Sequence, residues 1–471
     1  MLPEPKNYSV YPSVYPTDVE STVWVVPNEK AFLMFEGEEY TVRVIGNNED
    51  VPDRADPRHH YVYRVKASGG VICFKHTFLK EQVNTVIVTY NEKDIVNQEV
   101  YSLREDLYAL TPLRGDLHAH SYRSDGERDP AAFLGHVREQ GYDFTTLSDH
   151  NRYYPGSEID DTYKDVRLGI THIQGEEVHV PETPVHIVHV GGKSSVAEIY
   201  LDNSEEYQAE MAEYKANVPD SVPAQYSERY AIAKWVSDNA HKVGGLVIFA
   251  HPYWIPVNSK AFNVCDELAM IFLKSDIFDA FEVIGGISSN LNNRQVALWG
   301  EARAEGARIP VVGSSDVHGL KGDSYFPNNF TVCFANSREE VDILAAVKSG
   351  LSVAVEAQGE GYSRIYRAYG SLRLVSYARF LLENYFPMLQ RVCQGEGVAM
   401  RYYAMGMTDK STVECQVEQT EQFKNIFFGR IEPILPNEEI VEFEDRARER
   451  HLRSPKTKGS GLVSDKVTRQ I

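Results

Sequence analysis

The sequence predicts an α/β fold: a small β-sandwich domain, then a barrel-like α/β domain, then a mainly helical segment. Three observations lead to this prediction. Short β-branched and aromatic runs fill the first part of the chain. Apolar strand-like runs then alternate with helical patterns, and an aromatic helical stretch follows them. We place the parts at residues 1–111, 112–358 and 359–445, with a flexible basic tail at 446–471.

The N-terminal part reads as several short strands separated by Gly, Asn, Asp and Pro. Its runs include "STVWVVP", "EYTVRVIG", "HYVYRVKA", "GVICFKHTF" and "NTVIVTY". Strands of this length with turn residues between them are typical of a β-sandwich. We expect an accessory domain here.

The central part contains seven apolar runs, most of them followed by a helical pattern. The runs are "PLRGDLHAH", "DFTTLSDH", "VRLGITHIQGEEV", "VHIVHVG", "GGLVIFAH", "IFDAFEVIG" and "RIPVVGSSDVH". Between the first two, Asp129 stands at an N-cap position, Pro130 at the first helical position and Gly141 after the end. Strands that alternate with helices predict parallel βα units, and seven of them suggest a barrel.

The C-terminal part changes character twice. The stretch "YSRIYRAYGSLRLVSYARFLLENYFPMLQRV" is helical in pattern and rich in aromatic residues, which we interpret as packing. From Arg446 onward basic residues outnumber acids, with Gly, Ser and Pro between them. We interpret this end as a solvated tail.

The composition of the chain narrows the classes of function and the cellular locations that we expect. The formal net charge of -20 disfavours sequence-independent binding of nucleic acid, so only short oligonucleotides remain as nucleic-acid substrates. The five scattered cysteines form no Cys-x-x-Cys pair, which is typical of a reducing cytoplasm. Neither a leader pattern nor a run long enough to span a membrane occurs, so we expect a cytoplasmic protein.

Potential metal ligands follow six of the seven predicted strands, the sixth being the exception. They are His118, His120 and Asp125; Asp149 and His150; Glu176 and Glu177; His186 and His189; His251; and Asp316 and His318. In parallel α/β barrels the loops after the strands meet at one end and hold the functional groups. A single histidine would usually be structural, but a coincidence at six strand ends indicates a metal site.

The chemical types of the candidate ligands indicate which metal ions the site would bind. Imidazole and carboxylate without thiolate suit Zn, Mn or Fe. The candidates are too many for one ion, so we expect two or three divalent ions that share a bridging carboxylate. Closely spaced ions of this kind are used to cleave phosphoesters.

The motifs "DLHAHSYRSDG", "SDHN", "GEEV", "VHIV", "AHP" and "GSSDVHG" occur in this order over residues 112–358. This series resembles the signature of the PHP (polymerase and histidinol phosphatase) superfamily. The resemblance implies a distorted seven-stranded (β/α)7 barrel, a di- or trinuclear site and hydrolysis of phosphate esters. A β domain ahead of the motifs is also similar to the carbaryl-hydrolase-like metallohydrolases, which admits carboxyl or carbamate esters.

The resemblance also implies the ligands. They are His118, His120, Asp125, His150, Glu177, His186, His251, Asp316 and His318. Glu177 is the implied bridge, with Glu176 as the alternative. His189 is the alternative to His186, and strand alternation makes the two face opposite ways.

We therefore expect a metal-dependent phosphoesterase that acts on a small molecule or nucleotide through a metal-bridging hydroxide. An exonuclease on short oligonucleotides and a carboxyl or carbamate ester hydrolase are the alternatives. Asp149 is the candidate proton donor, or else it orients a ligand. Arg123 and Arg152 are candidates for binding the substrate phosphate, as is Arg294. An assembly of identical chains is left open.

Overall fold

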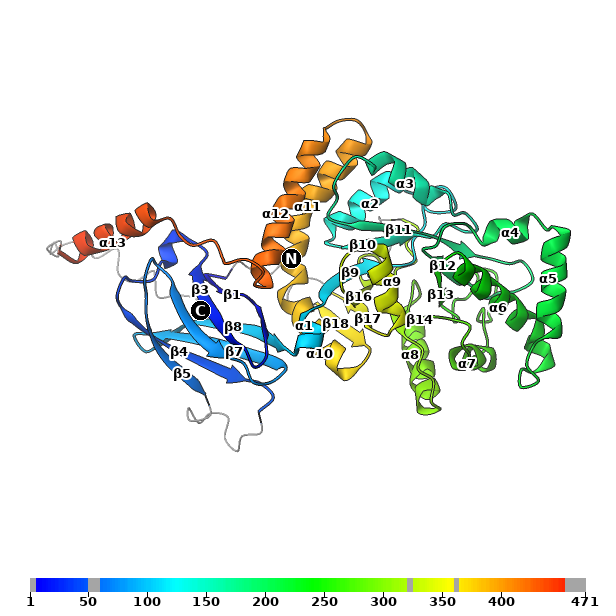
Figure 1. The fold of residues 1–471 in the computed structure, drawn as a ribbon, viewed down its shortest axis with the longest axis horizontal. Helices are drawn as coiled ribbons and strands as arrows, with labels where there is room; N and C mark the ends of the chain where they lie inside the picture. The colour runs from blue at the N-terminus through cyan, green and yellow to red at the C-terminus, as the bar shows by residue number, and fades with distance from the viewer. Residues whose placement is uncertain (1–5, 50–59, 320–324, 360–363, 454–471) are drawn as a thin grey trace. The chain divides into compact units, whose positions relative to one another are not determined.

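The computed structural model describes residues 6–49, 60–319, 325–359 and 364–453, and these form two compact units (Figure 1). One unit comprises residues 103–428 with the short segment 80–82. The other is built from described residues within 5–79, 83–102 and 429–471. None of the described helices is both long and apolar enough to cross a membrane.

The smaller unit consists of two antiparallel sheets around one apolar core. One sheet has the order β1 (Tyr8–Tyr11), β3 (Glu20–Pro27), β6 (Ile72–Thr77). The other has the order β2 (Val14–Pro16), β8 (Lys93–Leu103), β7 (Gln82–Tyr90), β4 (Glu39–Gly46), β5 (Tyr61–Lys66). Val23 and Phe74 of the first sheet share a buried core with Val42 and Val86 of the second. Alternating apolar residues on both sheets therefore produce the two-layer packing.

A C-terminal helix, α13 (Glu438–Arg453), belongs to the same unit. The guanidinium of Arg448 donates to the carbonyl of Leu33 (3.0 Å) and lies over the ring of Phe35, 4.4 Å from its centroid. The boundary expected at residue 446 thus falls inside a helix. Pairing of Glu442 with Arg446, one turn apart, shows why the basic residues here can be helical.

The larger unit is organised around one ten-stranded sheet. Its order is β15 (Val311–Gly313), β14 (Ala280–Ile284), β13 (Leu246–Phe249), β12 (Ile187–Val190), β11 (Thr171–Val178), β10 (Phe144–Leu147), β9 (Thr111–Asp116), β16 (Asn329–Ala335), β17 (Ser352–Gln358), β18 (Ile365–Tyr369). Strands β9 to β15 coincide with the seven predicted apolar runs. A parallel bridge between Ala119 and Val317, just past β9 and β15, brings the first and last of these seven strands together, so that they form a nearly closed barrel.

The expectation that these strands are all parallel is wrong for β12. This strand runs antiparallel to both β11 and β13. Its connection from β11 spans only residues 179–186 and contains no helix, whereas a parallel crossover needs about a dozen residues or more. As a result, the start of β12, and not its end, lies at the same end of the barrel as the ends of β11 and β13.

Nine of the described helices lie between or beside these strands, and several of them pack on the sheet. They are α1 (Glu105–Tyr108), α2 (Pro130–Glu139), α3 (Pro155–Tyr163), α4 (Ala197–Leu201), α5 (Glu205–Ala216), α6 (Ser227–Lys242), α7 (Asp266–Lys274), α8 (Ser289–Ala304) and α9 (Glu340–Lys348). The predicted N-cap of α2 is confirmed, because the Asp129 carboxylate accepts from the N–H of Ala132 (3.0 Å). Outward residues such as Phe249 and Phe281 pack on the helices, and inward residues such as Ile248 fill the barrel.

Three further helices, α10 (Leu372–Asn384), α11 (Phe386–Ala404) and α12 (Lys410–Phe427), follow the sheet. Helix α11 packs along α2, where Gly135 and Gly397 face each other. A Cβ at either position would come within 3 Å of the other's carbonyl oxygen. A buried ion pair, Arg138 with Glu396 (2.8 Å), also joins the two helices. The aromatic C-terminal helices are therefore fixed to the barrel.

Candidate metal centre

The two histidines of the first motif lie on a strand extension beside the last motif. The N–H of His120 donates to the carbonyl of Val317 (2.9 Å), and that of Asp316 donates to the carbonyl of His118 (2.9 Å). This pairing sets the side chains of Asp316 and His118 in contact, with Oδ1 3.3 Å from Nε2. The same Oδ1 is 3.0 Å from Nε2 of His120. The barrel closure thus assembles donors from segments almost two hundred residues apart.

Glu177 lies at the centre of the histidines and divides them into two groups. Its Oε2 is 3.3 Å from His118, 3.4 Å from His120 and 2.9 Å from His150. Its Oε1 is 3.1 Å from His179, 2.9 Å from His186 and 3.5 Å from His251. A carboxylate with a different set of imidazoles on each oxygen has the arrangement expected of a bridge between ions.

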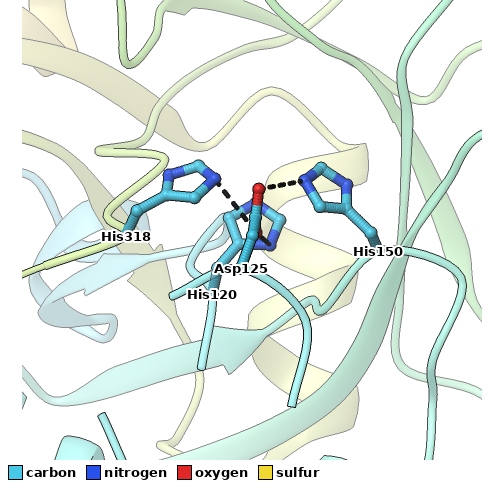
Figure 2. A group of neighbouring side chains, drawn as sticks. All are labelled: His120, Asp125, His150 and His318. Atoms are coloured by element: carbon cyan, nitrogen blue, oxygen red, sulfur yellow. Dashed lines mark ion pairs between the residues drawn. The ribbon is translucent and has the colours of Figure 1, made fainter. Parts of the chain in front are cut away.

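Asp125 lies on the solvent-exposed side of the centre (Figure 2). Its oxygens lie 3.3 Å from Nε2 of His150 and 3.3 Å from Nε2 of His318, and Oδ1 is 4.0 Å from Nδ1 of His120. The Asp125 side chain is 55% exposed, while His118 is fully buried. Solvent and substrate therefore have access from the Asp125 side.

The polar atoms of the centre fit a metal-binding site. Buried atoms without a hydrogen-bond partner include His118 Nε2, His150 Nδ1, His179 Nε2, Glu177 Oε1 and both ring nitrogens of His251. Such atoms are costly to bury unless a cation binds them. Several groups of three or four donors lie within 4.8 Å of one another. The residues in these groups are His118, His120, Asp125, His150, Glu177, His179, His186, His251, Glu282, Asp316 and His318.

The pKa shifts in the centre also indicate a site that favours bound cations. Burial acts to raise the pKa of Glu177, but His179 and His118 outweigh it and hold the pKa well below its ordinary value. Burial acts to lower the pKa of His150, yet the neighbouring carboxylates of Asp125 and Glu177 raise it to about 10. Without metal, protonation of imidazoles such as that of His150 places positive charge beside the carboxylates. Bound divalent ions would supply it instead, with the imidazoles neutral.

All nine predicted ligands come together in this centre, and the alternatives do not. Glu176 and His189 contact each other on the opposite face of the sheet, with Nδ1 3.1 Å from Oε1. The Glu176 carboxylate also accepts from the hydroxyl of Ser195 (2.6 Å) and the N–H of Val196 (2.6 Å), next to the start of α4. Both residues are buried there, and their pairing serves the packing of α4.

Asp149, one of the candidates for catalysis outside the ligand set, is held by hydrogen bonds to the first motif. The carboxylate of Asp149 accepts from the N–H (2.9 Å) and hydroxyl (2.7 Å) of Ser121 and from the hydroxyl of Ser124. It therefore anchors the loop that carries Asp125, and it belongs to none of the donor groups found among the described residues.

The three candidate arginines differ in whether an ion pair already holds the guanidinium group. Arg123 forms a two-pronged pair with Glu158, at 2.8 and 2.9 Å. Arg294 pairs with Asp266 (2.6 Å). The Arg152 side chain is exposed, and no ion pair holds it within the described part of the chain.

Sequence reasoning missed two residues of the centre, Glu282 and His179. Oε2 of Glu282 is 3.0 Å from Nδ1 of His118, and the residue faces inward from β14. A carboxylate inside the apolar run "AFEVI" was the signal that could have revealed it. His179 stands two residues after Glu177, so strand alternation places the two on the same side.

No family model matches the chain, and no curated protein matches it. Solved structures that it resembles include a two-domain protein from Bacteroides vulgatus that contains a predicted PHP-like metal-dependent phosphoesterase. That match has 19% identity and a TM-score of 0.37, and covers 52% of this chain and 65% of the other. The chain thus matches less than two thirds of that protein's length.

Two further structures resemble the chain. One is a candidate metal-dependent phosphoesterase from Bifidobacterium adolescentis, with 18% identity, a TM-score of 0.32, and coverage of 45% of this chain and 91% of the other. Another is an amidohydrolase from Chromobacterium violaceum with bound sulfate and no metal, with 18% identity, a TM-score of 0.29, and coverage of 45% and 89%. All three likenesses are remote.

Proposed function

We propose that this chain is a metal-dependent hydrolase of the PHP superfamily that cleaves phosphate esters of small molecules or nucleotides. The observation that supports this most is the position of Glu177, whose two oxygens contact two different sets of imidazoles. Two or three ions of Mn, Zn or Fe suit the imidazole and carboxylate donors. When bound, such ions lower the pKa of water and neutralise charge on phosphoryl oxygens.

Other residues of the protein hold the metal ligands in position. Glu282 fixes the ring of His118 so that Nε2 faces Glu177 and Asp316. Asp149 holds the loop of Asp125 in place through its serine contacts. These contacts keep the donors in position before the substrate arrives, which is how a preorganised site lowers a reaction barrier.

Arg152 is the residue that we propose for binding the substrate phosphate. It follows His150 and Asn151 in the chain, on the segment that borders the centre, and its side chain is exposed. Arg123 is committed to Glu158 and would first have to release it. A guanidinium at the open side would bind phosphoryl oxygens and orient the ester bond.

The test is a substrate screen with the full chain, reconstituted with Mn²⁺ or Zn²⁺. We expect release of phosphate from one or more monoesters or diesters, loss of activity on chelation, and loss in a His118→Ala variant. A His241→Ala variant is the matched control, because His241 pairs with Asp279 outside the centre (2.7 Å). Short single strands and aryl or carbamate esters test the alternative substrates. Activity that survives complete metal removal would refute the proposal.

A further inference from the structure

We propose that His179 is a metal ligand in addition to the nine, and that it binds an ion at the edge of the centre together with His150 and Glu177. This inference rests on the proposed metal-dependent function and extends its ligand set. It concerns a residue that no part of the sequence pattern assigned.

The three donor atoms are close together and lack partners. His179 Nε2 is 3.1 Å from Glu177 Oε1, and His150 Nδ1 is 2.9 Å from Glu177 Oε2. The donors of these three residues all lie within 4.8 Å of one another. None of His179 Nε2, His150 Nδ1 and Glu177 Oε1 has a hydrogen-bond partner, although each is buried. Three ligand atoms that are buried without a hydrogen-bond partner, in residues whose donors lie this close together, are what an ion would bind.

His150 can serve this ion without giving up its other contact. Its two ring nitrogens face different carboxylates, Nδ1 toward Glu177 and Nε2 toward Asp125 at 3.3 Å. The group of His120, Asp125, His150 and His318 lies on the Nε2 side (Figure 2). The edge site on the Nδ1 side is therefore distinct from that group.

The backbone around His179 is held in place by neighbours that are not ligands. The N–H of His179 donates to Oδ1 of Asn151 (2.7 Å), and Nδ2 of Asn151 donates back to the carbonyl of His179 (3.1 Å). The same carbonyl accepts from the hydroxyl of Tyr200 (2.6 Å). Asn151 itself has φ 52°, a left-handed conformation that Asn tolerates better than most residues. The imidazole is thus presented to Glu177 by a rigid local structure.

Ring packing fixes the direction of the imidazole. The His179 ring lies 3.9 Å from that of His186 and 4.4 Å from that of His150, measured between centroids. The side chain as a whole is 30% exposed, whereas its Nε2 atom is buried against Glu177.

The experiment measures metal binding by the full chain, with Mn²⁺ or Zn²⁺ alone as the probe. Ions per chain are counted by atomic emission after dialysis, and Kd values come from competition with a chelator. Loss of even an outer partner of a ligand weakens metal binding about 10–100-fold. We therefore expect His179→Gln to raise the Kd of one ion at least tenfold while the other ions are retained. His172→Gln is the control, because His172 contacts Asp160 outside the centre (3.1 Å).

A second measurement needs no variant. Diethyl pyrocarbonate modifies unliganded imidazole nitrogens, and peptide mass spectrometry locates the product. We expect His179 of the wild-type chain to be modified without metal and protected once metal is added. Equal modification in both states, or unchanged ion number and Kd in His179→Gln, would overturn the inference.

The two failures can be told apart. If the wild-type chain binds no ion at all, the proposed function fails and this inference with it. If the wild type binds ions and His118→Ala loses them, but His179→Gln does not, only the role of His179 is refuted.

Discussion

Replacement of Glu282 by leucine should weaken metal binding although Glu282 lies behind the ligands. Its Oε2 is 3.0 Å from Nδ1 of His118, on the side of the ring opposite to the contact with Glu177. A carboxylate at this position fixes the ring orientation and makes the other nitrogen a better donor. Leucine retains the bulk of the side chain and removes the acceptor.

The size of the effect follows from the burial of this pair. Glu282 and His118 are both fully buried, so no water replaces the lost acceptor. Loss of such a partner weakens metal binding about 10–100-fold, or about 1.4–2.7 kcal/mol. Glu282→Gln should lose less, because its amide oxygen still accepts from Nδ1–H. We therefore expect Kd values in the order wild type, Glu282→Gln, Glu282→Leu.

Chelator competition with Mn²⁺ or Zn²⁺ measures these constants. Glu356→Gln is the control, since this nearly buried carboxylate pairs with Arg367 (3.0 Å) and belongs to no donor group among the described residues. Thermal unfolding without metal shows whether the variants fold. A folded Glu282→Leu that binds metal as tightly as the wild type would refute the role of the pair.

Three further predictions concern other parts of the chain. Gly286→Ala places a Cβ 2.4 Å from Cβ of Asp316, so kcat in a phosphoester assay should fall about 10–100-fold with the fold retained; unchanged kcat would contradict this. Glu396→Ala leaves the buried Arg138 without its closest partner, and urea unfolding should show a loss of about 3–5 kcal/mol; a loss below 1 kcal/mol would count against it. Burial lowers the pKa of His76 to about 4, so the unfolded chain takes up a proton between pH 6.5 and 4 that the folded chain does not. Stability should therefore fall as the pH drops through that window, less so in His76→Phe, and an identical pH profile for both would refute the assignment.

The alternation of side chains along strands explains why much of the centre could be predicted. Glu177 and His186 enter the centre while Glu176 and His189 face the helices, as the two-residue period of a strand requires. The spacing within the first motif also sufficed, because His118 and His120 share one face of the extended chain. These are local properties that depend on neighbouring residues alone.

Glu282 and His179 carry weaker local signals, because the contacts that give them a role form only when the barrel closes. Glu282 lies within an apolar strand, and only the closed sheet brings it to His118, 164 residues away in sequence. His179 belongs to a connection whose shape is set by Asn151 on another strand end. Strand alternation puts His179 on the side of Glu177, but the other residues that lie within reach of it are fixed only in the folded sheet.

The reversal of β12 shows how residues that do come together in the structure can be predicted from an incorrect strand direction. In a parallel strand over this run, the first residue would lie at the far end of the barrel and His186 would be distant from Glu177. Because β12 is antiparallel, His186 precedes the strand at the same end as Glu177, and its Nδ1 is 2.9 Å from Oε1. The short connection of residues 179–186 forces this direction, since it is too short for a crossover. The same constraint keeps His179 and His186 at one end of the barrel, with ring centroids 3.9 Å apart. Lengthening this connection should therefore move the imidazoles of His179 and His186 away from Glu177 together. The proposed edge site and the contacts of Glu177 Oε1 thus both depend on the length of the segment 179–186.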